Sequence, residues 1–176
     1  LEQIRELGPD DMLLALVSGG GSSLLTLPPA EISLADLQTL TRALLASGAP
    51  IQEMNAVRKH LSLVLGGRLA ACCRAPVRTL AISDVAGDAM THIASGPFTS
   101  DPTTFNDALE VLSSRRIKAP PAVRDYLEAG AAGIHPETPK PGSPALANVE
   151  AHVVASGRIS LAAAAKYLRE RGVHPI

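Results

Sequence analysis

A run of three glycines between serines is the stretch of this sequence best suited to bind a charged group. Residues 18–23 read Ser-Gly-Gly-Gly-Ser-Ser and directly follow the apolar run 14–17. Glycines let the backbone turn sharply, and the N–H groups exposed in such a turn can surround an anion. A helix beginning after the turn would add the positive end of its dipole. The alternative is a flexible turn between a strand and a helix. The candidate residues for a phosphate or carboxylate cradle are Ser18, Gly19, Gly20, Gly21 and Ser22.

A stripe of polar residues on a predicted helix offers further hydrogen-bond donors. The helix begins at Pro50, where a missing N–H costs nothing, and apolar residues recur along it at helical spacing. On another side, polar residues fall at i, i+3, i+4 and i+7 and so share one face. The spacing alone favours a solvated face, and the functional alternative is a set of donors aimed at an anionic or hydroxylated ligand. The four residues are Asn55, Arg58, Lys59 and Ser62.

Two acidic residues follow a second apolar run, and another polar loop comes shortly after them. Asp84 directly follows the apolar run 77–83, and Asp88 comes four residues later. Ligands in open α/β sheets bind at the carboxyl ends of strands, where a carboxylate can hold Mg²⁺, orient a hydroxyl or accept its proton. Capping of the turn is the alternative role for Asp84. Ser95 and Gly96 have no such structural explanation, so we expect them in a loop that faces a ligand.

These candidate residues sit in a pattern of alternating strands and helices. Apolar runs that do not alternate with polar residues predict buried parallel strands. Capping patterns predict helices between them, including one with Ser33 as its N-cap and one that starts at Asp101–Pro102. Residues 130–147 are rich in Gly, Ala and Pro and should form a long loop. The fold class is therefore α/β, as a three-layer Rossmann-like domain with a mostly parallel sheet. The predicted strands are 12–17, 77–83 and 149–155.

Composition narrows the range of partners. The chain has 176 residues, enough for one domain with a substantial core, and a net charge of −1. Without a basic excess, and with 2% aromatic residues and no Trp, it does not fit a protein that binds nucleic acid or a membrane surface.

The only cysteines, Cys72 and Cys73, are adjacent and cannot form a disulfide that stabilises the fold, which indicates a reducing compartment. No apolar run reaches the roughly 18 residues of a membrane span, so we expect a cytoplasmic protein. The composition leaves open whether it forms a homo-oligomer.

Four segments of the chain carry a resemblance to a known family. They are residues 17–25 (VSGGGSSLL), 51–62 (IQEMNAVRKHLS), 82–88 (ISDVAGD) and 93–104 (IASGPFTSDPTT). In order and spacing they resemble the glycerate 2-kinase family, whose C-terminal region is known as the MOFRL domain. Some members of that family are named hydroxypyruvate reductase. The four linked motifs are together far more specific than any one of them.

The resemblance implies ATP-dependent phosphorylation of D-glycerate to 2-phosphoglycerate, assisted by Mg²⁺. It also implies an active site in a cleft between two domains. Residues 1–176 would then be part of the N-terminal α/β domain, incomplete at both ends and without the MOFRL domain. The sequence departs from the family pattern at Leu65, where the family usually has Lys, and at Ala89, where it often has a second acid.

The same resemblance assigns roles to the candidate residues. Arg58 would clamp an anion with its planar guanidinium, and Asp84 would either accept the proton of the attacking hydroxyl or bind Mg²⁺. These two are the expected catalytic residues, and Asp84 and Asp88 are the expected metal ligands. The residues expected to bind substrate or phosphate are Ser18, Gly19, Gly20, Gly21, Ser22, Asn55, Lys59, Ser95 and Gly96.

Two other functions remain open at this point. One is a reductase that acts on hydroxypyruvate with NAD(P)H, although a dinucleotide fold favours G-x-G-x-x-G and this stretch has Leu24 at the last position. The other is a truncated relative without catalytic activity, which binds a small anion or only assembles with a partner.

Overall fold

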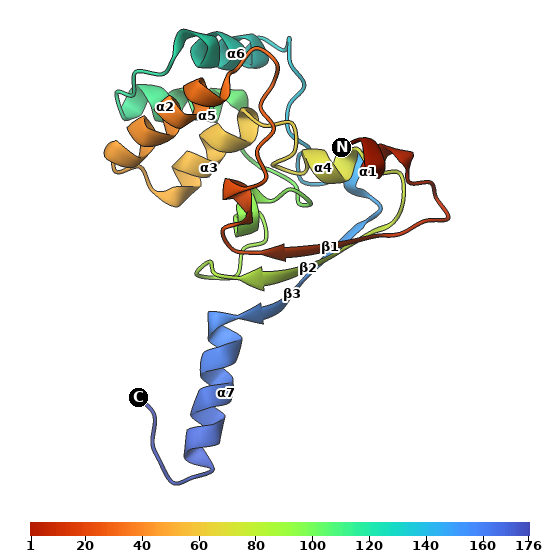
Figure 1. The fold of residues 1–176 in the computed structure, drawn as a ribbon. Coiled ribbons are helices and arrows are strands. Elements are labelled where there is room, and N and C mark those ends of the chain that lie inside the picture. Colours follow the sequence, from red (N-terminus) through yellow and green to blue (C-terminus); the bar gives the residue numbers. More distant parts are fainter.

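The chain folds into a three-stranded sheet with helices α1 to α6 gathered on one side of it (Figure 1). The computed structural model describes all residues from Leu1 to Ile176. The strands are β1 (Leu13–Ser18), β2 (Val77–Ser83) and β3 (Val149–Ser156). The helices are α1 (Glu2–Glu6), α2 (Leu34–Ala46), α3 (Ile51–His60), α4 (Arg68–Ala71), α5 (Phe105–Ser114), α6 (Pro121–Ala131) and α7 (Gly157–Arg169). Three short 3₁₀ turns complete the elements: η1 (Gly21–Ser23), η2 (Ile93–Ser95) and η3 (Pro144–Leu146).

The sheet confirms the three predicted strands and their parallel alignment. β2 lies in the middle and pairs in parallel with β1 on one side and β3 on the other. Because all three strands run in the same direction, their carboxyl ends lie at one edge of the sheet. There Ser18 stands opposite Ile82, and Ser83 stands opposite Ser156.

Two apolar clusters hold the helices in place. The larger one packs α2, α3, α5 and α6 together around Leu44, Val57 and Phe105, which are fully buried. The smaller one lies between α4 and the sheet and contains Leu69 and Val77. Both clusters lie on the same side of the sheet, so the covered face and the group of helices form one packed unit.

The helix starts follow local capping, with one correction. The predicted capping box of α2 is present, because Ser33 and Asp36 exchange side-chain and backbone hydrogen bonds. The prediction that the next capped helix starts at Asp101 is wrong. Thr104 and Asp107 form the capping box of α5. Asp101 lies three residues before the N-cap residue Thr104 and is fully buried. The predicted loop after residue 130 is confirmed, since only η3 interrupts the stretch between α6 and β3.

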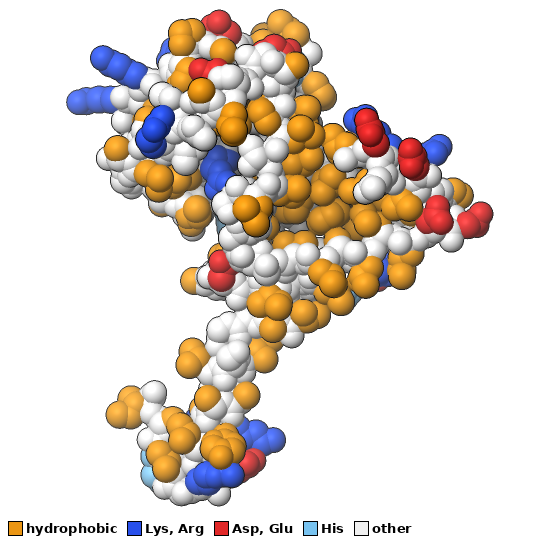
Figure 2. Space-filling model, viewed as in Figure 1, with side chains coloured by type: hydrophobic (Ala, Val, Ile, Leu, Met, Phe, Trp, Pro, Cys, Tyr) orange, Lys and Arg blue, Asp and Glu red, His pale blue; other side chains and the backbone are white.

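The opposite face of the sheet is largely apolar and uncovered, with the Arg78–Glu150 ion pair and His152 among its leucines. Leu14, Leu16, Ile82 and Val154 are each more than half exposed, with Leu16 at 74%. Figure 2 shows hydrophobic atoms along this side of the strands. Helix α7 leads away from the sheet and buries none of its residues (Figure 1). The α/β class and the parallel sheet are thus confirmed, while helices of this chain cover only one of the two faces that a three-layer fold would cover. No helix combines the length and apolarity needed to cross a lipid bilayer.

We predict that this uncovered face makes the isolated chain bind hydrophobic dyes and self-associate. Leu16→Lys should lower the fluorescence of bound 8-anilinonaphthalene-1-sulfonate and shift sedimentation toward the monomer. It should change stability by less than about 0.5 kcal/mol, because the side chain is 74% exposed. Leu24→Lys is the matched control, since Leu24 is 90% exposed but lies outside the sheet. An equal effect of both substitutions on dye binding would contradict the prediction.

Candidate functional site

The candidate site lies at the edge where the three strands end. Each strand closes with a serine, and the residues that follow are Gly19, Asp84 and Gly157. This is the edge at which open α/β sheets bind ligands. Helix α7 begins at Gly157, and Ser156 caps it by accepting a hydrogen bond from Ile159 N–H. The predicted glycine loop therefore lies beside the loop that follows β2, while β3 leads directly into α7.

The glycine loop forms an open turn with backbone donors that have no partner in the protein. Gly20 has a φ of +76°, a left-handed conformation that favours glycine. The N–H groups of Gly19 and Gly20 donate to no acceptor in the chain. No helix follows the loop directly, since only the single turn η1 comes before α2, which begins at Leu34. An anion bound here would therefore rely on backbone N–H groups and not on a helix dipole.

Close contacts bring Asp84 and the η2 segment against this loop. A Cβ atom added to Gly19 would lie 2.0 Å from Asp84 Oδ2, so the carboxylate rests directly on the glycine backbone. A Cβ added to Gly21 would lie 3.3 Å from the Cβ of Ala94, the middle residue of η2. Only glycine fits at position 19 without moving the acid. Two of the predicted loops thus meet the glycine loop at one place.

Arg58 reaches the same loop from helix α3. Its Nη2 donates to the carbonyl oxygen of Ser22 at 3.1 Å. Burial lowers the pKa of Arg58, and no acidic side chain contributes to it. The guanidinium nevertheless stays protonated, because an arginine does not lose its charge in proteins. The bond to Ser22 is its one side-chain hydrogen bond within the chain, so the guanidinium brings a positive charge and free N–H donors to the loop that contains Gly19 and Gly20.

Asn55 and Ser95 also come together, but they face each other and not an open cavity. Ser95 Oγ donates to Asn55 Oδ1 at 3.0 Å, and both side chains are at most 2% exposed. Gly96, next in sequence, is buried as well. We expected these residues to line a pocket. In the structure their side chains join α3 to the η2 segment, which holds that segment in position.

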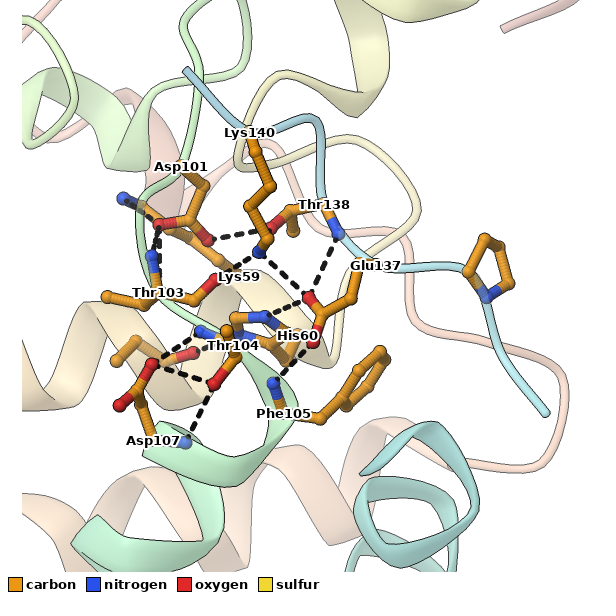
Figure 3. Close-up of polar contacts among 12 residues, drawn as sticks. Lys59, His60, Asp101, Thr103, Thr104, Phe105, Asp107, Glu137, Thr138 and Lys140 are labelled. Atoms are coloured by element: carbon orange, nitrogen blue, oxygen red, sulfur yellow. Dashed lines mark hydrogen bonds and ion pairs between the residues drawn. The ribbon is translucent and has the colours of Figure 1, made fainter. Parts of the chain in front are cut away.

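Lys59 does not share a ligand-facing stripe with Arg58, which corrects the prediction. Its ammonium group is 2% exposed and lies 3.2 Å from Asp101 Oδ1 and 3.0 Å from Thr91 Oγ1 (Figure 3). Consecutive helical residues point about 100° apart, so Arg58 reaches the glycine loop while Lys59 enters the interior. Ser62 lies beyond the end of α3, where its hydroxyl accepts hydrogen bonds from the N–H groups of Val64 and Leu65.

A polar network behind the site has no counterpart in the sequence predictions (Figure 3). Glu137, from the loop between α6 and β3, accepts hydrogen bonds from Phe105 N–H at 2.9 Å and Lys140 Nζ at 2.9 Å. It also lies 3.0 Å from His60 Nε2. Lys140 additionally donates to the carbonyl oxygen of Thr103. No local sequence pattern could have predicted the contacts of Glu137, because His60 and Glu137 are 77 residues apart.

The acidic residues offer an incomplete metal site. No cluster of three or more His, Cys, Asp or Glu side chains is placed to hold a metal ion. Asp88 adopts a φ of +56° and lies 3.6 Å from the Nε of Arg158 at the start of α7. Asp84 and Asp88 remain two oxygen donors at the ligand-binding edge. Mg²⁺ commonly takes one or two carboxylates and completes its coordination with water and substrate phosphates, so the donor types fit that ion.

A larger groove opens beside Arg58. It has a volume of about 600 Å³ and lies between the segment 22–27, helix α2 and helix α3. Leucine side chains make most of its apolar wall, and Arg58 and Ser22 are among its polar lining residues. The site therefore has a small polar part at the glycine loop and a wide apolar neighbour.

The chain is similar to known proteins along almost its whole length. Residues 1–128 match the family described as a domain of unknown function, DUF4147. An Agrobacterium vitis protein named as a hydroxypyruvate reductase is 48% identical over 98% of this chain and 43% of its own length. A Pyrococcus horikoshii protein named glycerate 2-kinase is 46% identical over 98% of this chain and 38% of its own length. The crystal structure of a glycerate kinase from Thermotoga maritima matches with a TM-score of 0.83 at 42% identity, over 97% of this chain and 39% of that one. The chain thus spans about two fifths of the length of these relatives.

We predict that Glu137 makes the fold sensitive to acid. Burial raises the pKa of Glu137, but hydrogen bonds from Lys140 and Phe105 N–H and the nearby His60 outweigh burial and hold it below its usual value. A carboxyl group whose pKa is depressed by folding stabilises the fold above its unfolded pKa of about 4.3, and this contribution is lost as the pH falls through the folded value. Because the Glu137 side chain is 37% exposed and water screens its ion pairs, Glu137→Gln should lower stability at pH 7 by only about 1 kcal/mol. It should also flatten the loss of stability below about pH 5.

Urea unfolding between pH 3 and pH 7 would measure this effect. Glu128→Gln is the control, because Glu128 pairs only with Arg124 on the exposed side of α6, at 3.5 Å. A Glu137→Gln profile parallel to that of the unmodified protein would refute the role of this carboxylate.

Proposed function

The chain belongs to the DUF4147 family, and from this premise we propose that it supplies the phosphate-binding and hydroxyl-activating half of a glycerate 2-kinase. The proposed reaction transfers the γ-phosphoryl group of ATP to the 2-hydroxyl group of D-glycerate. Because the chain spans about two fifths of its named relatives, we assign the remaining substrate contacts to the part of such proteins that lies beyond this chain.

One observation carries the proposal: three groups that phosphoryl transfer requires meet at the strand edge. The unpaired N–H groups of Gly19 and Gly20, the guanidinium of Arg58 and the carboxylate of Asp84 all touch one loop. Phosphoryl transfer depends mainly on positioning and on neutralising charge on the transferred group. Backbone donors and a guanidinium supply that charge compensation, while a carboxylate can accept a proton.

In the proposed mechanism Asp84 acts on the attacking hydroxyl. Its carboxylate accepts the proton of the 2-hydroxyl group as that oxygen bonds to the γ-phosphorus of ATP. The bond from the γ-phosphorus to the bridging oxygen breaks, and ADP leaves with the electron pair. Arg58 and the N–H groups of Gly19 and Gly20 bind the non-bridging oxygens of the phosphoryl group or the carboxylate of glycerate.

We further propose ATP and Mg²⁺ as the cofactors, and the cytoplasm, where ATP is abundant, as the location. Asp84 and Asp88 would hold the metal together with phosphate oxygens, and the ion would reduce the negative charge on the phosphates. Asp84 would then have a second role besides accepting the proton.

A hydroxypyruvate reductase is the second candidate, because an Agrobacterium vitis relative that is 48% identical carries that name. The loop geometry weighs against it. A dinucleotide fold places the pyrophosphate at the start of a helix that follows the glycine turn directly. Here only the turn η1 follows the glycines, and helix α2 begins at Leu34.

The deciding experiment measures both reactions with protein expressed from its complete reading frame. We predict D-glycerate-dependent formation of ADP in the presence of Mg²⁺, with ³¹P NMR identifying 2-phosphoglycerate. Asp84→Asn should lower kcat by at least about 100-fold, because it removes the proton acceptor. Arg58→Lys keeps the charge but loses the planar fork, so it should raise a substrate KM by about tenfold.

Arg124→Lys is the matched control, because Arg124 lies on the exposed side of α6 and pairs only with Glu128. It should retain normal kinetics. Oxidation of NADH with hydroxypyruvate, without any formation of ADP from ATP and glycerate, would replace the kinase proposal by the reductase.

A further inference from the structure

We propose that Lys59 is a positioning residue that ties together the two ends of the loop 91–101 and so presses Ala94 against the glycine loop. This inference rests on the proposed function, because it assigns Lys59 an effect on phosphoryl transfer without contact with the substrate. It replaces the expectation that Lys59 itself binds phosphate.

The hydrogen bonds of Lys59 close the base of that loop. Its Nζ donates to Thr91 Oγ1 at 3.0 Å at one end of the loop and to Asp101 Oδ1 at 3.2 Å at the other end. Thr91 Oγ1 in turn donates to the carbonyl oxygen of Ser100 at 3.2 Å. The ends of an eleven-residue segment are thereby held together by one side chain from helix α3; Figure 3 shows its bond to Asp101.

Asp101, the acidic partner of Lys59, is itself held in place by several hydrogen bonds. Asp101 is fully buried and accepts hydrogen bonds from Thr103 N–H at 3.1 Å, Thr103 Oγ1 at 2.8 Å and Thr138 Oγ1 at 3.1 Å. Burial lowers the pKa of Lys59, and the charge of Asp101 opposes that effect. Such a buried pair is expensive to form and seldom stabilises a fold more than apolar side chains would. In this chain the Lys59–Asp101 pair fixes the position of the loop 91–101 relative to helix α3.

The part of the loop between the two ties has a backbone that needs external support. Ala94, Ser95 and Gly96 have consecutive φ values of +49°, +58° and +60°. The first two carry a Cβ, so this left-handed conformation is unfavourable for them. Backbone strain that persists only because its surroundings enforce it is common at functional sites.

The supported segment lies next to the proposed phosphate cradle. The N–H groups of Gly66 and Gly67 donate to the carbonyl oxygens of Ser95 at 3.1 Å and Gly96 at 2.7 Å. On the other side, Ala94 lies where a Cβ on Gly21 would approach it to 3.3 Å. Release of the loop base would let Ala94 withdraw and change the position of the glycine loop. Misplacement of a reacting group by about 1 Å can lower a rate by 100-fold.

The test uses Thr91, because its substitution loosens the loop base and leaves the buried ion pair intact. Thr91→Val should lower kcat for ATP and D-glycerate by at least tenfold and change either KM by less than threefold. Thr91→Ser keeps the hydroxyl and should restore kcat to within threefold of the unmodified protein. Hydrogen exchange followed by mass spectrometry should show faster exchange in residues 18–25 and 91–101 of Thr91→Val.

A double variant addresses Lys59 itself. Lys59→Met/Asp101→Asn removes both charges together, so no single buried charge remains. It should lower kcat by at least tenfold. Glu53→Gln/Arg115→Met is the control on the same helix, because this pair joins α3 to α5 through contacts of 2.8 and 2.9 Å away from the loop. It should keep kcat within twofold of the unmodified protein even if the melting temperature falls.

Each outcome separates the two proposals. Unchanged kcat and unchanged exchange in a folded Thr91→Val variant would overturn the positioning role. If the double variant does not fold, the comparison of Thr91→Val with Thr91→Ser still decides the question. If the unmodified protein does not phosphorylate glycerate, the kinase proposal fails, while the exchange measurement on residues 18–25 still confirms or refutes the mechanical link from the loop base to the glycines.

Discussion

The parallel alignment of three short strands is the constraint on which the candidate site depends. Since β1, β2 and β3 run in one direction, the chain must leave the sheet three times at the same edge. The residues at those exits, Gly19, Asp84 and Gly157, become neighbours although they are far apart in sequence. An antiparallel sheet of the same sequence would divide them between two edges.

Helix α3 gives the site its cation and its support at the same time. Arg58 and Lys59 are adjacent, yet one lies beside the glycine loop and the other is buried against Asp101. The side chains differ in chemistry as well as direction. A guanidinium keeps its charge when half-buried and can bind two oxygens at once, whereas an ammonium group is a compact donor to several acceptors. The order Arg-Lys therefore places one cation beside the glycine loop and the next one in an internal ion pair.

Much of the architecture followed from the sequence. The three apolar runs were long enough, and free enough of alternation, to identify parallel strands, and the Ser33–Asp36 pattern predicted its helix start correctly. The meeting of the glycine loop, Arg58 and Asp84 also followed, because strand ends and a helix face have fixed directions.

The remaining features depend on contacts that local patterns do not encode. Asp101 before Pro102 has the local pattern of a helix N-cap. In the structure, however, Thr104 and Asp107 form the capping box of α5, and the Asp101 carboxylate is buried in an ion pair with Lys59. Helical spacing placed Asn55, Arg58 and Lys59 on one face without revealing that a distant loop would cover most of it. The predicted ligand-facing role of Ser95 did not anticipate its buried hydrogen bond to Asn55, which lies 40 residues away in the sequence.

The contact between Gly19 and Asp84 has a consequence for how this protein can change during evolution. Every missense mutation of a glycine codon introduces a Cβ atom, and at this position that atom would fall 2.0 Å from a carboxylate oxygen. All nineteen replacements share this first contact, and each would displace the exposed Asp84 side chain from its present position. A side chain at residue 19 could therefore be accommodated only if the Asp84 carboxylate moved away from the glycine loop, so the two positions are coupled through this contact.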